Sequence, residues 1–155
     1  MNSIPLLDRI SIYDLLCKFQ STFDLQDWKH MEECLWEQLY VDYSSFRNEA
    51  PGLMMSKDYV ALRQVALEGL KMQHNFSNLV LNVDGNNASA RCNYQILRFR
   101  TTDCRYEIDF FHSYGRYIFD LSKRNREWRI SGICQELISN HGNTSLHQAI
   151  LKKNP

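Results

Sequence analysis

Apolar and polar residues follow two different patterns along this chain of 155 residues. From residue 4 to residue 73, apolar residues recur at steps of three and four, which is typical of amphipathic helices. From residue 74 to residue 138, apolar and polar residues alternate, and β-branched and aromatic residues are frequent, which is typical of strands. The pattern therefore predicts an α+β fold in which helices come first and a sheet follows.

The first predicted helix begins after Ser3, which can cap a helix N-terminus, and ends near Asp24. Its expected buried stripe consists of Leu6, Ile10, Tyr13, Leu16 and Cys17. Continued by steps of three and four, this stripe reaches Asp24. Because an ionised carboxylate on a buried face is costly without a partner, we expect Asp24 to be paired or hydrogen-bonded.

Two shorter helices are predicted over residues 28–36 and 57–70, with Asp27 and Ser56 as their N-caps. The segment from residue 39 to residue 46 between them has the composition of a strand.

Four long strands follow, joined by short polar turns such as Gly85 and Asn86. They are expected over residues 74–84, 87–100, 106–121 and 127–137. This order favours a curved antiparallel sheet with the helices packed on its concave side. No linker interrupts residues 1–138, which we expect to form one domain, and the polar residues 139–155 could be a mobile tail or a lid.

Charge and composition exclude several classes of protein. Eighteen basic residues balance eighteen acidic ones, so nothing indicates a nucleic-acid partner, and no apolar run is long enough to span a membrane. The first residues lack the features of a signal peptide, which leads us to expect a cytoplasmic protein. Five cysteines without a CxxC pair indicate reduced thiols, neither a disulfide framework nor a zinc site.

Asp24 and His74 are the first candidates for chemistry. His74 opens the first long strand, on the same predicted face as Phe76 and Asn78. A histidine held by a buried carboxylate is the basic unit of a general base, because the carboxylate fixes the tautomer and supports the imidazolium. The alternative is a structural aspartate and an exposed histidine.

Three segments carry a resemblance to a known family. They are STFDLQDWKHMEECLWEQLYVDYSSF at residues 21–46, MQHNFSNL at 72–79, and HSYGRYIFDLSKRNREWRISGI at 112–133. Together they resemble the SnoaL-like branch of the NTF2-like superfamily, and within it the scytalone dehydratases, over about residues 5 to 138. The resemblance implies a cystatin-like cone in which a curved antiparallel sheet wraps the N-terminal helices around an apolar pocket.

The resemblance also implies catalytic roles. Asp24 and His74 match an aspartate and histidine dyad that removes a proton next to a carbonyl or a leaving group, and Tyr43 matches a tyrosine that holds a carbonyl-polarising water. Such enzymes need no metal and no organic cofactor. Phe23 stands where the dehydratases have a second tyrosine, and Thr101 where they have a second histidine. A substrate other than scytalone is therefore expected.

The wall of the expected pocket follows from strand parity and from the resemblance. Residues of the third long strand that share one face with Phe111 and Ser113 form its pocket side. The candidate ligand contacts are Phe46, Leu97, Phe99, Tyr117, Ile133 and Leu137, which could instead simply fill a core. Asp109 is either an assisting acid in the pocket or the partner of Arg98 or Arg100 in a salt bridge.

These observations predict a small-molecule lyase or isomerase that acts on an apolar or aromatic molecule. The alternatives are a ligand-binding or interaction module without activity, and the small subunit of a ring-hydroxylating dioxygenase. His30, Glu33 and Cys34 lie at a helical spacing that a metal could use, but we assign no metal to them. The family resemblance further implies a homodimer or homotrimer formed through the outer face of the sheet.

Overall fold

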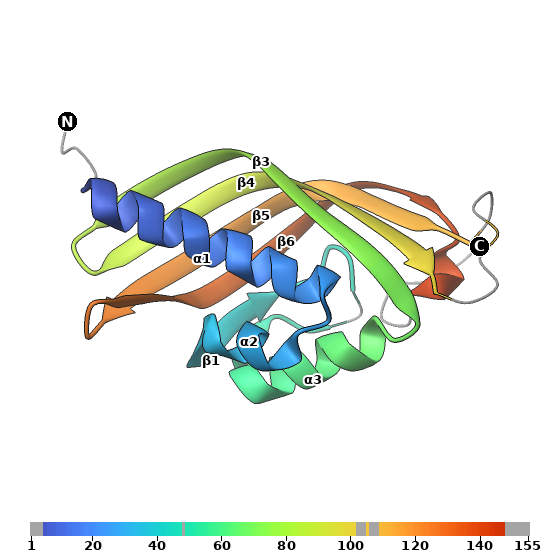
Figure 1. Cartoon of the computed structure of the whole chain (residues 1–155), viewed down its shortest axis with the longest axis horizontal. Helices are drawn as coiled ribbons and strands as arrows, with labels where there is room; N and C mark the ends of the chain where they lie inside the picture. Colours follow the sequence, from blue (N-terminus) through green and yellow to red (C-terminus); the bar gives the residue numbers. More distant parts are fainter. Residues whose placement is uncertain (1–4, 48, 102–104, 106–108, 148–155) are drawn as a thin grey trace.

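The computed structural model describes residues 5–47, 49–101, 105 and 109–147 (Figure 1). Within them the helical elements are α1 (Leu6–Asp24), α2 (Trp28–Glu33), α3 (Ser56–Ala66) and a 3-10 turn, η1 (Thr144–Leu146). The strands are β1 (Leu35–Asp42), β2 (Gly52–Met55), β3 (Leu70–Asp84), β4 (Asn87–Arg100), β5 (Phe111–Arg124) and β6 (Glu127–Gly142). The predicted α+β order, helices before the long strands, is confirmed.

The strands of the described residues form one curved, open sheet in the order β2-β1-β6-β5-β4-β3. The four long strands β3 to β6 pair antiparallel with their neighbours in sequence, as predicted. β1 differs, because it pairs parallel with β6 and antiparallel with β2. Figure 1 shows α1 lying across one face of the sheet, with α2 and α3 beyond its C-terminal end. This arrangement is that of a cystatin-like, NTF2-like cone.

The stripe predicted for α1 is confirmed at Leu16 but is wrong at Leu6, Ile10 and Tyr13. The residues that α1 buries are Ile12, Leu16, Phe19, Gln20, Thr22 and Phe23, whereas Leu6, Ile10 and Tyr13 are exposed. Residues ten and twelve lie on nearly opposite sides of a helix, since each residue turns the chain by about 100°. Both sides of α1 carry apolar residues at steps of three and four, and the side with Phe19 and Phe23 packs on the sheet. The predicted cap, Ser3, lies outside the described residues.

β3 changes its buried face at a β-bulge between Ser77 and Val80. Before the bulge Leu70, Met72 and His74 face inward, and Phe76 is half-buried on the same side. Asn78 has a φ of 56° and is exposed, so it does not share a face with His74 as the parity had predicted. The bulge arises because one extra residue breaks the alternation of the strand.

The C-terminal segment contributes more to the domain than predicted. β6 continues to Gly142, past the expected end at residue 137, and the η1 turn and the buried His147 follow it. Residues 139–147 are therefore strand and turn, whereas the rest of the predicted tail lies outside the described residues. Within the described residues, no helix is both long and apolar enough to cross a membrane.

Candidate active site

Asp24 and His74 contact each other across the junction of α1 and β3. His74 Nδ1 lies 2.6 Å from Asp24 Oδ1, and the backbone N–H of His74 donates to both carboxylate oxygens at 3.0 Å. Gln26, in the turn after α1, donates from Nε2 to the carbonyl of Leu70 at 2.9 Å. That bond ties the end of the helix to the start of the strand, and so brings the two side chains together.

The pair is largely shielded from water. The side chain of His74 is 3% exposed and that of Asp24 is 25% exposed. The ring of Phe23 stacks on the imidazole with a centroid separation of 4.7 Å. Burial lowers the pKa of His74, and the hydrogen bond to Asp24 offsets part of this effect. The imidazole is therefore neutral at neutral pH, with its Nδ1–H directed to the carboxylate and the lone pair on Nε2.

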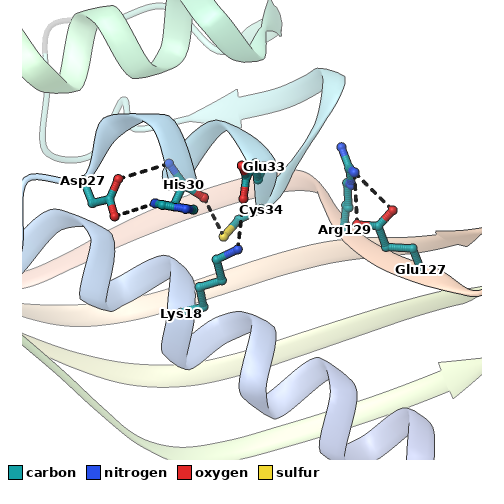
Figure 2. Close-up of polar contacts among 7 residues, drawn as sticks. All are labelled: Lys18, Asp27, His30, Glu33, Cys34, Glu127 and Arg129. Atoms are coloured by element: carbon teal, nitrogen blue, oxygen red, sulfur yellow. Dashed lines mark hydrogen bonds and ion pairs between the residues drawn. The ribbon is translucent and has the colours of Figure 1, made fainter.

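A second aspartate and histidine pair lies on α2 and serves as a comparison (Figure 2). His30 Nδ1 lies 2.6 Å from Asp27 Oδ2, the same separation as in the first pair, but the side chains are 50% and 39% exposed. Asp27 caps α2 by accepting from the His30 N–H. Figure 2 also shows Glu33 paired with Lys18, and the Cys34 thiol donating to the His30 carbonyl. The predicted Asp27 cap is confirmed, and this pair stabilises a helix end in water.

Tyr43 forms a buried pair with Tyr59. The two hydroxyl oxygens are 2.7 Å apart, and the guanidinium of Arg63 lies over both rings, 4.6 Å and 4.8 Å from their centroids. Burial raises the pKa of Tyr59 well above 10. Two neutral hydroxyls share one hydrogen bond between them, which leaves the second O–H able to donate to another group.

Several residues predicted for the pocket wall do lie inside the fold, on the inner face of the sheet or on the elements packed against it. Phe23, Phe46, Tyr117 and Ile133 are buried. Gln135 donates from Nε2 to the Tyr117 hydroxyl at 3.1 Å. Leu137 is half-buried beside them, and its N–H donates to Ser45 Oγ.

Other predicted wall residues lie elsewhere. Leu97 and Phe99 occupy the outer face of β4, because the even-numbered residues of that strand point inward. The ring of Phe99 accordingly lies 5.2 Å from His112, which is on the outer face of β5. Thr101 is exposed, and its hydroxyl donates to the carbonyl of Gly69. The prediction that Leu97, Phe99 and Thr101 line the pocket is therefore wrong.

Asp109 contacts Arg100 and Arg105 at 3.4 and 3.5 Å, so of the two readings of this residue the salt bridge is the one observed. Arg98, the other arginine considered as its partner, points to the opposite side of β4. Its Nη1 donates to Ser113 Oγ at 2.9 Å inside the fold.

Buried arginines are the feature that the sequence interpretation missed. Among the described residues Arg47, Arg63 and Arg98 are 3%, 0% and 1% exposed. Strand parity could have found Arg98, because it continues the buried row of Tyr94 and Ile96. Arg47 follows β1 in an irregular segment, where no period indicates its direction.

The N-terminal helices and the curved open sheet together define a protein with the cystatin-like, NTF2-like fold. More specifically, the sequence matches the SnoaL-like domain over residues 5–133, and the chain belongs to that family. No curated protein matches the sequence significantly.

Solved structures of the same fold include enzymes. The Kfla4162 protein from Kribbella flavida superimposes with a TM-score of 0.82 at 18% identity, over 92% of this chain and 98% of that one. The "Putative Scytalone Dehydratase" from Novosphingobium aromaticivorans gives 0.72 at 12% identity, over 97% of both chains. A type 2 hexachlorocyclohexane dehydrochlorinase gives 0.73 at 15% identity, over 93% and 94%. These similarities show the fold.

Proposed function

We propose that the protein is a small-molecule lyase or isomerase in which His74 acts as the general base and Asp24 positions it. The observation that carries the proposal is the 2.6 Å contact between the two side chains, together with the burial of the imidazole. A neutral histidine in a dry environment, with its tautomer fixed by a carboxylate, is ready to take a proton at Nε2.

In the proposed reaction Nε2 removes a proton from a carbon next to an electron-withdrawing group. The electron pair of the broken C–H bond moves toward that group as an enolate forms. In an elimination, a leaving group on the adjacent carbon then departs with its own electron pair. In an isomerisation, the imidazolium returns the proton to another carbon of the substrate. General base catalysis of this kind contributes about 10²- to 10⁴-fold to a rate.

Buried polar groups of the same fold could stabilise the enolate. Tyr43 and Tyr59 have one O–H donor to spare between them, and Arg98 supplies a buried positive charge. Preorganised donors of this kind are worth far more in a water-poor interior than in solvent. The dehydrochlorinase and dehydratase names of the structural relatives are consistent with proton abstraction followed by elimination.

The test is turnover of a panel of aromatic polyketides, steroid-like enones and terpenoid epoxides in D₂O, followed by mass spectrometry. Loss of a leaving group or uptake of deuterium reports proton abstraction. We expect the wild type and His30→Asn to turn over the same compound and His74→Asn to be inactive. His30 is the matched control, since it has the same contact to an aspartate at an exposed position.

Undiminished turnover by His74→Asn would refute the assignment of the base. Compounds that stabilise the wild type and His74→Asn equally, with none consumed by either, would favour the ligand-binding module instead.

A further inference from the structure

The interior around the dyad contains more positive than negative charge. Counted over the described residues, three guanidinium groups, those of Arg47, Arg63 and Arg98, are buried there. Glu49 is the carboxylate close to two of them, with Oε2 2.5 Å from Arg63 Nη2 and Oε1 4.0 Å from Arg47 Nη1. Asp24 is engaged by His74, which is neutral. Set against the two carboxylates of Glu49 and Asp24, the three guanidinium groups leave one unit of positive charge uncompensated.

All three buried arginines have unused donors, but Arg63 is hydrogen-bonded to the Glu49 carboxylate, whereas Arg98 and Arg47 have no carboxylate within hydrogen-bond distance among the described residues. Within the described part of the chain, Arg98 Nε has no hydrogen-bond acceptor, and its one bond runs from Nη1 to Ser113. Arg47 likewise has no acceptor for Nε or Nη1, because 4.0 Å to Glu49 is too long for a hydrogen bond. Burying an ionised donor without a partner is costly, so these groups indicate a missing acceptor.

Aromatic rings flank the same two guanidinium groups. Phe46 is shared between them, with its centroid 5.8 Å from the guanidinium carbon of Arg47 and 5.5 Å from that of Arg98. Phe111 lies 5.4 Å from the Arg98 carbon and parallel to Phe46, at an interplanar angle of 7°. The unused donors therefore lie beside two parallel buried rings, against which the imidazole of His147 also packs.

Electrostatics connect this cluster to the dyad. Burial and the charge of Arg47 lower the pKa of Arg98 to about 9. Burial and the charge of Arg63 lower the pKa of Arg47 to about 10. Both arginines remain charged at neutral pH, and both contribute to the lowered pKa of His74. The arginines and the imidazole therefore share one interior.

We infer that this site takes an organic anion, namely a small aromatic or unsaturated carboxylate. The carboxylate lies between Arg98 and Arg47, and the apolar part lies against Phe46 and Phe111. Guanidinium is suited to this role because its planar donors match the two oxygens of a carboxylate. The carboxylate acts as a handle, and a second electron-withdrawing group activates the C–H bond for His74. This last step rests on the proposed function, whereas the binding does not.

The test compares benzoate with benzamide, a neutral molecule of the same shape, by isothermal titration calorimetry on the full chain. We expect the wild type to prefer benzoate by at least about tenfold. Arg98→Met and Arg47→Met should lose this preference. Arg100→Met is the matched control and should keep it, because Arg100 lies two residues further along β4 with an exposed side chain. His74→Asn should also keep it, which separates failure of the anion site from failure of the proposed base.

A second measurement distinguishes a ligand-binding arginine from a structural one. Arg98→Met removes a buried charge that has a single hydrogen bond, so its thermal midpoint without ligand should equal or exceed that of the wild type. A lower midpoint with an unchanged preference for benzoate would overturn the inference. If Arg98→Met fails to fold, the preferences of the wild type and Arg47→Met decide. Equal binding of the two probes by the wild type, or binding of neither at about 10 mM, would also overturn it.

Discussion

Replacing Asp24 by asparagine tests the dyad without any substrate. The carboxylate accepts one hydrogen bond from the His74 ring and a bifurcated hydrogen bond from the His74 backbone N–H, which is shared by its two oxygens. Hydrogen bonds to a charged acceptor are worth about 1.5–3 kcal/mol, and an amide oxygen would keep about 1 kcal/mol of this. Asp24 is also the last residue of α1, where a negative charge is unfavourable by about 0.3–1 kcal/mol. The net expected loss in the free energy of unfolding is about 1–2 kcal/mol, measured by urea denaturation.

The same variant should change the titration of His74. Burial lowers the pKa of His74, and Asp24 raises it by hydrogen bonding and by its charge. With the charge removed, desolvation acts with less opposition, so the pKa should fall below that of the wild type. An NMR titration of the imidazole C–H signals measures it. Asp27→Asn is the control, because asparagine is also a good helix cap and the pair there is exposed.

A purely structural Asp24 would show the loss of stability alone. If the His74 pKa in Asp24→Asn equals or exceeds the wild-type value, the carboxylate does not support the imidazolium. The proposed role of Asp24 would then be wrong, even if the protein is destabilised as expected.

Three further predictions concern the fold. Phe19→Ala should lower the free energy of unfolding by about 3–5 kcal/mol, and the exposed Leu7→Ala should lower it by less than about 0.5 kcal/mol. If urea denaturation gave the two variants similar losses, the buried side assigned to α1 would be wrong. Burial lowers the pKa of His74 and places that of His147 well below 6.5, so the folded state binds fewer protons than the unfolded chain. The stability that depends on these neutral histidines should be fully present above about pH 6.5, and the thermal midpoint should fall as the pH drops below that value. His147→Gln should weaken this fall, and the exposed His141→Gln should not. Gly115→Ala should lower the free energy of unfolding by about 1–3 kcal/mol in urea denaturation, because a Cβ there would meet the Glu136 carbonyl and lie 2.7 Å from the Tyr94 hydroxyl. At Gly52 a Cβ would meet nothing within 4 Å, so Gly52→Ala should leave the free energy of unfolding unchanged.

The sequence was sufficient to predict the contact between Asp24 and His74, but not the composition of the whole interior. Asp24 faces His74 although most of the predicted stripe is wrong, because Asp24 lies four residues after Gln20, which α1 buries. Two apolar sides of one helix cannot be distinguished by spacing, since the choice between them depends on the sheet they meet. Leu97 and Phe99 are apolar, yet the alternation of β4 points them outward, so neither apolar character nor the family resemblance identifies the inner face of this strand. The bulge in β3 is visible in the sequence only as a change in the parity of the apolar residues, from Met72 and Phe76 to Leu79, Leu81 and Val83.

A buried arginine is harder to predict from the sequence than a buried apolar residue. An arginine in an alternating strand is normally assigned to the solvent side, because its charge favours water. Arg98 lies inside because tertiary neighbours from β5 and from the segment after β1 surround it, and these include Ser113, Phe111 and Phe46. Such a residue is found from sequence only if the parity of the strand is given more weight than the polarity of the side chain.

The two proposals together predict that anion binding and proton uptake assist each other. Burial lowers the pKa of His74, and the charges of Arg98 and Arg47 lower it further, which keeps the base unprotonated before a ligand arrives. An anion that compensates their charge removes part of this effect, so the affinity of His74 for a proton rises when the substrate is bound. Because such coupling is reciprocal, benzoate should bind the wild type more tightly as the pH falls between about 7 and 5. Burial and the charges of the same arginines also lower the pKa of His147, so His74→Asn should weaken this pH dependence without abolishing it, and should keep the preference for benzoate over benzamide. An equal pH dependence in both proteins would show that the arginines and the histidine act independently.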